Sequence, residues 1–111
     1  MKENYYHGFM NGLLINGCSL IREQKSNFES GNGYIDLILL SSSRSSIIIL
    51  ELKRTDDEVA DSRKITREAI KQIINTRYAD AYMENETITS IYAYGICFYK
   101  KHSSVAVQKL K

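Results

Sequence analysis

The 111-residue sequence contains no proline, no low-complexity tract, no internal repeat and no linker. A chain of this length can bury one modest core, so we expect residues 1–111 to form a single domain. Long apolar runs are also absent, because even Ile47–Leu50 is far too short to cross a bilayer. The amino terminus lacks the apolar block of a secretory signal. We therefore expect an intracellular, cytoplasmic protein with no membrane partner.

Cysteine is scarce as well. Cys18 and Cys97 lie far apart and form no CxxC pair, which indicates two reduced, partly buried thiols. A Cys2His2 metal site with His7 and His102 is an alternative, but its spacings resemble no structural zinc pattern. With 43% apolar and 25% charged residues, the composition is that of an ordinary globular protein. The net charge of +2 permits nucleic acid as a partner without requiring it.

Hydrophobic periodicity predicts an α/β fold. Apolar residues at helical spacing indicate a first helix over Glu3–Ile15 and a second, longer helix over about Ser62–Glu84. Asp61 or Ser62 is the expected N-cap of the second helix. Strands 46–54 and 87–101 flank this helix, so it should connect them as a crossover and make them parallel within a mixed sheet. The predicted strand segments are 18–29, 34–40, 46–54, 87–101 and 104–111.

Charged residues interrupt two of the most apolar strands. Asp36 lies inside the strand 34–40, and Glu51 and Lys53 share one face of the strand 46–54 because side chains alternate. A hairpin turn symmetric about the Ser43–Arg44 bond would place Asp36 directly opposite Glu51, and Tyr34 opposite Lys53. The Cβ atoms of directly opposed residues lie about 4.5–5.5 Å apart. The sequence therefore predicts two half-buried carboxylates side by side.

Two neighbouring carboxylates repel each other unless a cation lies between them. Lys53 is one candidate cation, and a structural ion pair at the end of a strand is the simpler interpretation of the pattern. A divalent metal is the other candidate, because Mg²⁺ prefers oxygen ligands and commonly uses one or two carboxylates. A lysine beside such an ion could orient or deprotonate a water molecule, which is the chemistry of metal-assisted phosphodiester hydrolysis.

Gln72 is a polar residue on the apolar stripe of the predicted crossover helix. It falls at helical spacing with Ala69 and Thr76, so its amide should face the sheet and need a hydrogen-bond partner there. Glu51, a metal-bound water or a substrate phosphate could supply that partner. The alternative is that Gln72 only bonds a strand carbonyl.

Several motifs in order resemble one known family. "GNGYID", "IIILELKR", "AIKQIINTRYA" and "YGICFYKK" together resemble the PD-(D/E)XK nuclease superfamily. More narrowly, the chain is similar to the nuclease-like domain at the C-terminus of many AAA-ATPase-like proteins. The likeness spans about Glu3–Lys101 and implies a restriction-endonuclease-like αβββαβ core, with a mixed central sheet and flanking helices. It also implies a nuclease that uses Mg²⁺ or Mn²⁺.

The resemblance assigns roles to individual residues. Asp36 and Glu51 match the metal-binding acids, and Leu52 would offer its backbone carbonyl to the same ion. Lys53 matches the lysine of the ExK motif, and Gln72 matches a glutamine that many members carry on the crossover helix. The upstream acids that match further carboxylate positions are Glu3 and Glu29.

The sequence departs from the family pattern at Tyr34, where arginine is common. An aromatic ring there replaces a second positive charge beside Lys53, which affects substrate preference and puts activity in question. A nuclease fold that only binds nucleic acid or protein, with little or no chemistry, is therefore the alternative function. Seven tyrosines, including Tyr78, could stack on bases, although a place in or around the core is the interpretation we favour. The remaining candidate contacts to nucleic acid are Tyr34, Lys71, Arg77 and Lys100.

The partners that follow from the resemblance are nucleic acid, with DNA favoured over RNA, a second copy of this chain, and an ATPase. The last of these arises because the chain could be one domain of a longer ATPase-type system.

Overall fold

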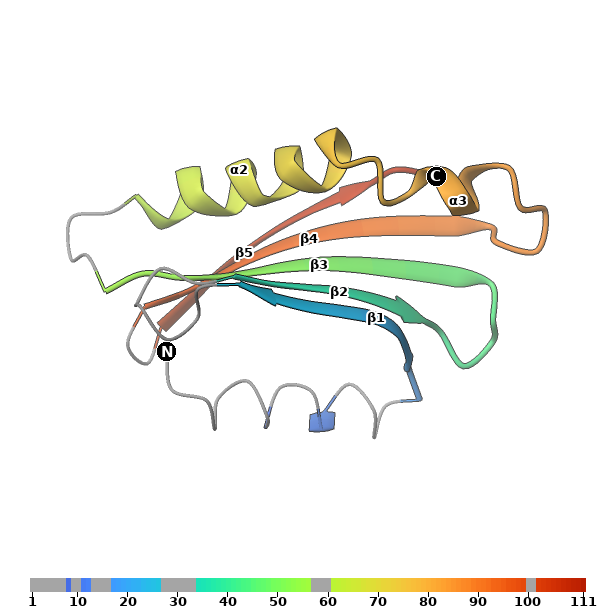
Figure 1. Ribbon diagram of the computed structural model, residues 1–111, viewed down its shortest axis with the longest axis horizontal. Coiled ribbons are helices and arrows are strands. Elements are labelled where there is room, and N and C mark those ends of the chain that lie inside the picture. Colours follow the sequence, from blue (N-terminus) through green and yellow to red (C-terminus); the bar gives the residue numbers. More distant parts are fainter. Residues whose placement is uncertain (1–7, 9–10, 13–16, 27–33, 57–60, 100–101) are drawn as a thin grey trace.

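The computed structural model describes residues 8, 11–12, 17–26, 34–56, 61–99 and 102–111. These residues form one five-stranded sheet whose spatial order follows the chain, from β1 to β5. They also form helices α2 and α3, which lie on the same side of the sheet (Figure 1). The bounds are β1 Ser19–Ser26, β2 Tyr34–Leu40, β3 Ser46–Arg54, α2 Ser62–Asn75, α3 Asp80–Met83, β4 Ser90–Tyr99 and β5 His102–Lys109.

The hairpin of β2 and β3 has the register expected from the symmetry of its turn. Asp36 pairs with Glu51, and the backbone of Tyr34 pairs with that of Lys53. The turn closes through hydrogen bonds from Ser41 N to Ser46 O (3.0 Å) and from Arg44 N to Ser41 O (2.9 Å). Arg44 adopts a positive φ of 62°, which tightens the turn without a glycine. The predicted opposition of the two acids is therefore confirmed.

The other strand pairings make the sheet mixed. β3 and β4 are parallel, as the helical crossover required, and β4 and β5 are antiparallel. β1 pairs antiparallel with β2 and carries an irregularity between Leu20 and Arg22. The α/β class with a mixed sheet is thus confirmed.

The sheet buries apolar side chains on both faces, as strands without polar alternation require. On the α2 side the buried cluster contains Ile38, Ile47, Ile49, Ile70, Ile73, Ala79, Ile88, Ile91 and Ala93. On the opposite side it contains Leu37, Leu39, Leu50, Leu52 and Ile96. Since Asp36 and Glu51 alternate with Leu37 and Leu50, the two acids lie on the α2 side.

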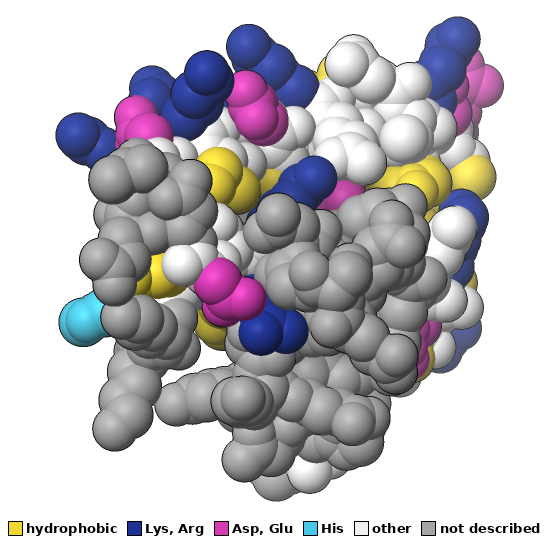
Figure 2. All heavy atoms as spheres, turned by 60° about the vertical axis from the view of Figure 1, so that its left-hand side comes forward, with side chains coloured by type: hydrophobic (Ala, Val, Ile, Leu, Met, Phe, Trp, Pro, Cys, Tyr) yellow, Lys and Arg dark blue, Asp and Glu magenta, His cyan; other side chains and the backbone are white. Residues whose placement is uncertain are grey.

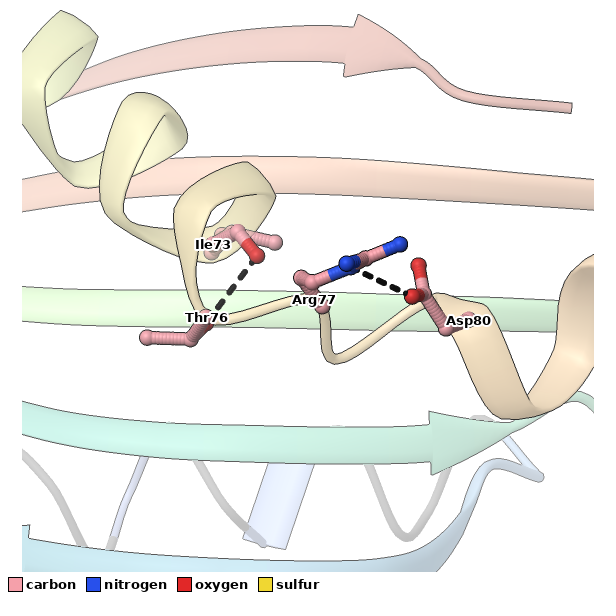
Figure 3. A network of polar contacts seen from close by, with 4 residues as sticks. All are labelled: Ile73, Thr76, Arg77 and Asp80. Atoms are coloured by element: carbon pink, nitrogen blue, oxygen red, sulfur yellow. Dashed lines mark hydrogen bonds and ion pairs between the residues drawn. The ribbon is translucent and has the colours of Figure 1, made fainter.

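The crossover helix is shorter than the sequence predicted. Asp61 caps its start by accepting hydrogen bonds from the backbone of residues 63 and 64, but the helix ends at Asn75 rather than near Glu84. Thr76 Oγ1 donates to the carbonyl of Ile73 over 3.0 Å (Figure 3) and to that of Gln72 over 2.8 Å. Arg77 then adopts a φ of 60°. The apolar stripe continues past this break, so periodicity alone extended the helix too far.

Part of the predicted first helix lies outside the described residues. Gly8, Asn11 and Gly12 are helical, and Gly17 follows with a φ of 85°, which suits the end of a helix. Cys18 and Cys97 are both free thiols, as expected. Among the described residues, no helix is long and apolar enough to span a membrane.

Candidate active site

Asp36 and Glu51 form a buried acid pair on β2 and β3. Asp36 is 4% exposed and Glu51 is fully buried. Asp36 Oδ2 accepts a hydrogen bond of 2.8 Å from the Tyr78 hydroxyl. The other three oxygens of the pair, which are Asp36 Oδ1 and both carboxylate oxygens of Glu51, have no hydrogen-bond partner among the described residues outside the pair itself. Two buried carboxylates are costly to ionise side by side, so the pair needs either a proton or a cation between them.

The electrostatics of the pair follow from its burial. Burial raises the pKa of Glu51 to about 8. The hydrogen bond between Glu51 and Asp36 and the negative charge of Asp36 act in the same direction, and the charge of Lys53 acts in the opposite one. In the ion-free protein Glu51 therefore holds its proton at neutral pH. A divalent cation between the acids would favour the ionised form and release that proton.

Lys53 and Gln72 meet on the same side of the sheet. Lys53 Nζ donates to Gln72 Oε1 over 2.8 Å, so the amide of α2 finds its partner in the ExK lysine rather than in Glu51. This contact brings β3 and α2 together beside the acid pair. The four residues Asp36, Glu51, Lys53 and Gln72 thus share one face, while their chemical roles stay predictions.

Tyr78 and Arg22 complete the surroundings of the acid pair, and sequence reasoning missed both contacts. The Arg22 guanidinium lies over the Tyr78 ring, with its central carbon 4.9 Å from the ring centroid. Burial, and next the hydrogen bond to Asp36, raise the pKa of Tyr78 to about 12, so its hydroxyl stays a donor. In the structure β1 pairs Gln24 with Asp36 and Arg22 with Ile38, which places Arg22 on the same face as the acids.

Gly95 sets how closely α2 approaches the acid pair. It pairs with Glu51 across β3 and β4. A Cβ atom at Gly95 would collide with the backbone oxygen of Thr66 and lie 3.0 Å from the Ala69 Cβ. Only glycine therefore allows α2 to rest directly on the backbone of β4 at this point.

The side chains of the other predicted site residues that the structure describes, Leu52, Lys71 and Arg77, point away from the acid pair or bond elsewhere. The Leu52 side chain packs on the opposite face, as its alternation with Glu51 requires. Lys71 is exposed on α2, and Arg77 Nε pairs with Asp80 Oδ2 over 2.7 Å (Figure 3). Glu3, Glu29 and Lys100 lie outside the described residues, and so does the side chain of Tyr34. The roles predicted for these four residues therefore stay predictions.

Residues 1–108 match the family model of the PD-(D/E)XK nuclease superfamily. The chain belongs to this superfamily. Its sheet and helices are those of a restriction-endonuclease-like fold. No curated protein and no solved structure matches the sequence. The narrower likeness to domains of AAA-ATPase-like proteins stays a prediction.

The acid pair of this PD-(D/E)XK protein suits a hard divalent cation. Among the described residues, no group of three or more His, Cys, Asp or Glu side chains is placed to hold a metal ion, so the candidate ligands are the two carboxylates of Asp36 and Glu51. Mg²⁺ is commonly held by one or two carboxylates and keeps several water molecules. The unpartnered oxygens of the pair supply the ligand type that such an ion prefers.

Proposed function

We propose that this protein hydrolyses phosphodiester bonds of nucleic acid with the help of Mg²⁺ or Mn²⁺. The observation that carries the proposal is the buried, directly opposed pair Asp36 and Glu51, three of whose oxygens bond no described residue outside the pair. The pair lies on the face where Lys53 meets Gln72. Membership of the PD-(D/E)XK superfamily supports the same reaction class.

In this proposal each residue has a distinct task. Asp36 and Glu51 hold the ion, with the Leu52 carbonyl as a further oxygen ligand. The bound ion supplies Lewis acidity and a water of lowered pKa. Lys53 would orient the reacting water through Nζ or, when its amine is neutral, accept a proton from it. Gln72 keeps that amine in place, since its Oε1 accepts from Nζ.

Cleavage assays with Lys53→Met test the proposal directly. We expect the wild type to cut plasmid, single-stranded DNA, branched DNA or RNA with Mg²⁺ or Mn²⁺, and not with EDTA. Lys53→Met should lower the rate by roughly 10²- to 10⁴-fold, the usual contribution of a positioned acid or base, while still binding Mn²⁺.

The matched control is Lys109→Met, because Lys109 is exposed on β5 and lies near Tyr92 on the other face of the sheet. Its cleavage rate should equal that of the wild type. Cleavage that survives Lys53→Met would contradict the mechanism. Binding without cleavage on every substrate would instead support an interaction module.

We propose further that the exposed side of α2 contacts the phosphate backbone. Figure 2 shows Lys and Arg side chains gathered at the top of the molecule, where α2 lies. Arg63, Arg67 and Lys71 are exposed and spaced by four residues, so they form one stripe. Arg63 and Lys64 lie in the first turn, where the helix dipole disfavours cations. Helix stability therefore does not explain these charges.

Reversing one charge of this stripe tests the contact. Arg67→Glu should weaken binding to duplex DNA with little effect on stability. The slope of log K against log salt concentration should become shallower by about one unit or more, because one phosphate contact is lost. Fluorescence anisotropy over a salt series in EDTA measures both quantities without cleavage. Lys109→Glu carries the same charge change on the far face and should bind as the wild type does. Equal losses in the two variants would reveal only an effect of net charge.

A further inference from the structure

The break after α2 turns Tyr78 toward the sheet. Arg77, with its positive φ, directs its side chain to Asp80, and Ala79 is buried in the α2-side cluster. Between them Tyr78 packs against the same cluster and reaches the acid pair. Because α2 ends where it does, the Tyr78 hydroxyl lies within hydrogen-bond distance of Asp36, although the two residues are 42 positions apart in the chain.

The contacts of Tyr78 constrain the Asp36 carboxylate. The Tyr78 hydroxyl donates to Asp36 Oδ2 over 2.8 Å, whereas Oδ1 has no hydrogen-bond partner among the described residues outside the acid pair. A terminal carboxylate torsion is otherwise broad, so an unconstrained Asp36 would present either oxygen in many orientations. The Arg22 guanidinium over the ring adds a cation–π contact that holds the donor in place.

We propose that Tyr78 is a positioning residue that fixes the Asp36 carboxylate so that Oδ1 is presented to a divalent ion shared with Glu51. The inference rests on the proposed function, because it concerns the same ion. Carboxylate ligands of metal ions are generally oriented by such outer hydrogen bonds, and losing one typically costs about 10- to 100-fold in metal affinity or activity.

Tyr78→Phe tests this role, since it removes the hydroxyl but keeps the ring beneath Arg22. We expect the Kd for Mn²⁺, measured by calorimetry, to rise about 10- to 100-fold. The control is Tyr82→Phe, because Tyr82 packs against the same cluster without bonding Asp36. Its Mn²⁺ affinity should equal that of the wild type. Thermal unfolding in EDTA verifies that both variants are folded.

Rescue by the ion separates positioning from a general structural role. Cleavage by Tyr78→Phe should recover toward the wild-type kcat at saturating Mn²⁺. The Mn²⁺ concentration that gives half of this rate should rise by the same factor as the Kd. Wild-type Mn²⁺ affinity in Tyr78→Phe, an equal loss in Tyr82→Phe, or no recovery at high Mn²⁺ would each overturn the positioning role alone. A wild-type protein that binds no Mn²⁺ would overturn the proposed function and this inference together.

Discussion

Glu51→Gln is expected to remove Mn²⁺ binding and cleavage while making the ion-free protein more stable at alkaline pH. The substitution deletes one of the two carboxylates of the pair, so the loss of metal affinity should exceed the roughly 10- to 100-fold caused by losing an outer hydrogen bond. The stability of the ion-free protein at alkaline pH should rise, because the glutamine side chain would carry no charge and its amide could donate a hydrogen bond to Asp36. A single variant should therefore lose cleavage activity and gain stability.

The pH dependence follows from the raised pKa of Glu51. The unfolded chain releases this proton near pH 4.5, whereas the folded protein keeps it up to about pH 8. The folded state thus binds more protons between these values, and the free energy of unfolding falls as the pH rises through the window. The loss is on the order of several kcal/mol and is complete above about pH 8. In Glu51→Gln this contribution to the pH dependence should be absent.

Urea unfolding in EDTA between pH 5 and 9, together with Mn²⁺ calorimetry, measures both effects. Glu68→Gln is the matched control, because Glu68 is exposed on α2 and should affect neither. A wild-type stability that stays constant from pH 5 to 9 would contradict the raised pKa. Wild-type Mn²⁺ affinity in Glu51→Gln would contradict the role of Glu51 as a ligand.

Gly95→Ala should destabilise the fold and impair the site at once. The added Cβ would collide with the Thr66 carbonyl oxygen, so α2 must move away from β4. Overpacking of this kind costs typically about 1–3 kcal/mol, which should lower the unfolding temperature by roughly 5 °C or more. Because Gln72 moves with α2, its contact with Lys53 should weaken and cleavage should slow even where the protein is folded.

The matched control for this change is Gly12→Ala. Gly12 is helical, and a Cβ atom there would have no heavy atom within 4 Å. The same methyl group in open space should leave stability unchanged or slightly raised. An unfolding temperature of Gly95→Ala equal to that of the wild type would show that α2 does not depend on this close approach.

The sequence was most informative where local rules determine the structure. Strand alternation and the symmetry of a short turn were sufficient to place Asp36 opposite Glu51, and a polar residue before an amphipathic run located the cap at Asp61. It was least informative where the structure depends on contacts between distant segments. The end of α2 was missed because Thr76 bonds back to the helix while the apolar stripe continues.

The candidate site shows the same division. The acids and Lys53 come from one hairpin, so their relative placement could be predicted. Tyr78 and Arg22 join them only through tertiary packing, and a tyrosine that bonds a carboxylate looks like any core tyrosine in the sequence. The close approach at Gly95 is likewise visible only once α2 lies on β4.

The hairpin that carries the acids also restricts which insertions and deletions evolution can accept. The turn between these strands closes through backbone groups and through serine hydroxyls, since Ser41 Oγ accepts from Ser46 N over 3.1 Å and the hydroxyls of Ser43 and Ser45 lie 2.8 Å apart. A slip of one residue in the pairing of β2 with β3 would send one acid to the other face of the sheet. Descendants that keep the site should therefore preserve this register, and hydroxyl side chains in the turn are one means of doing so.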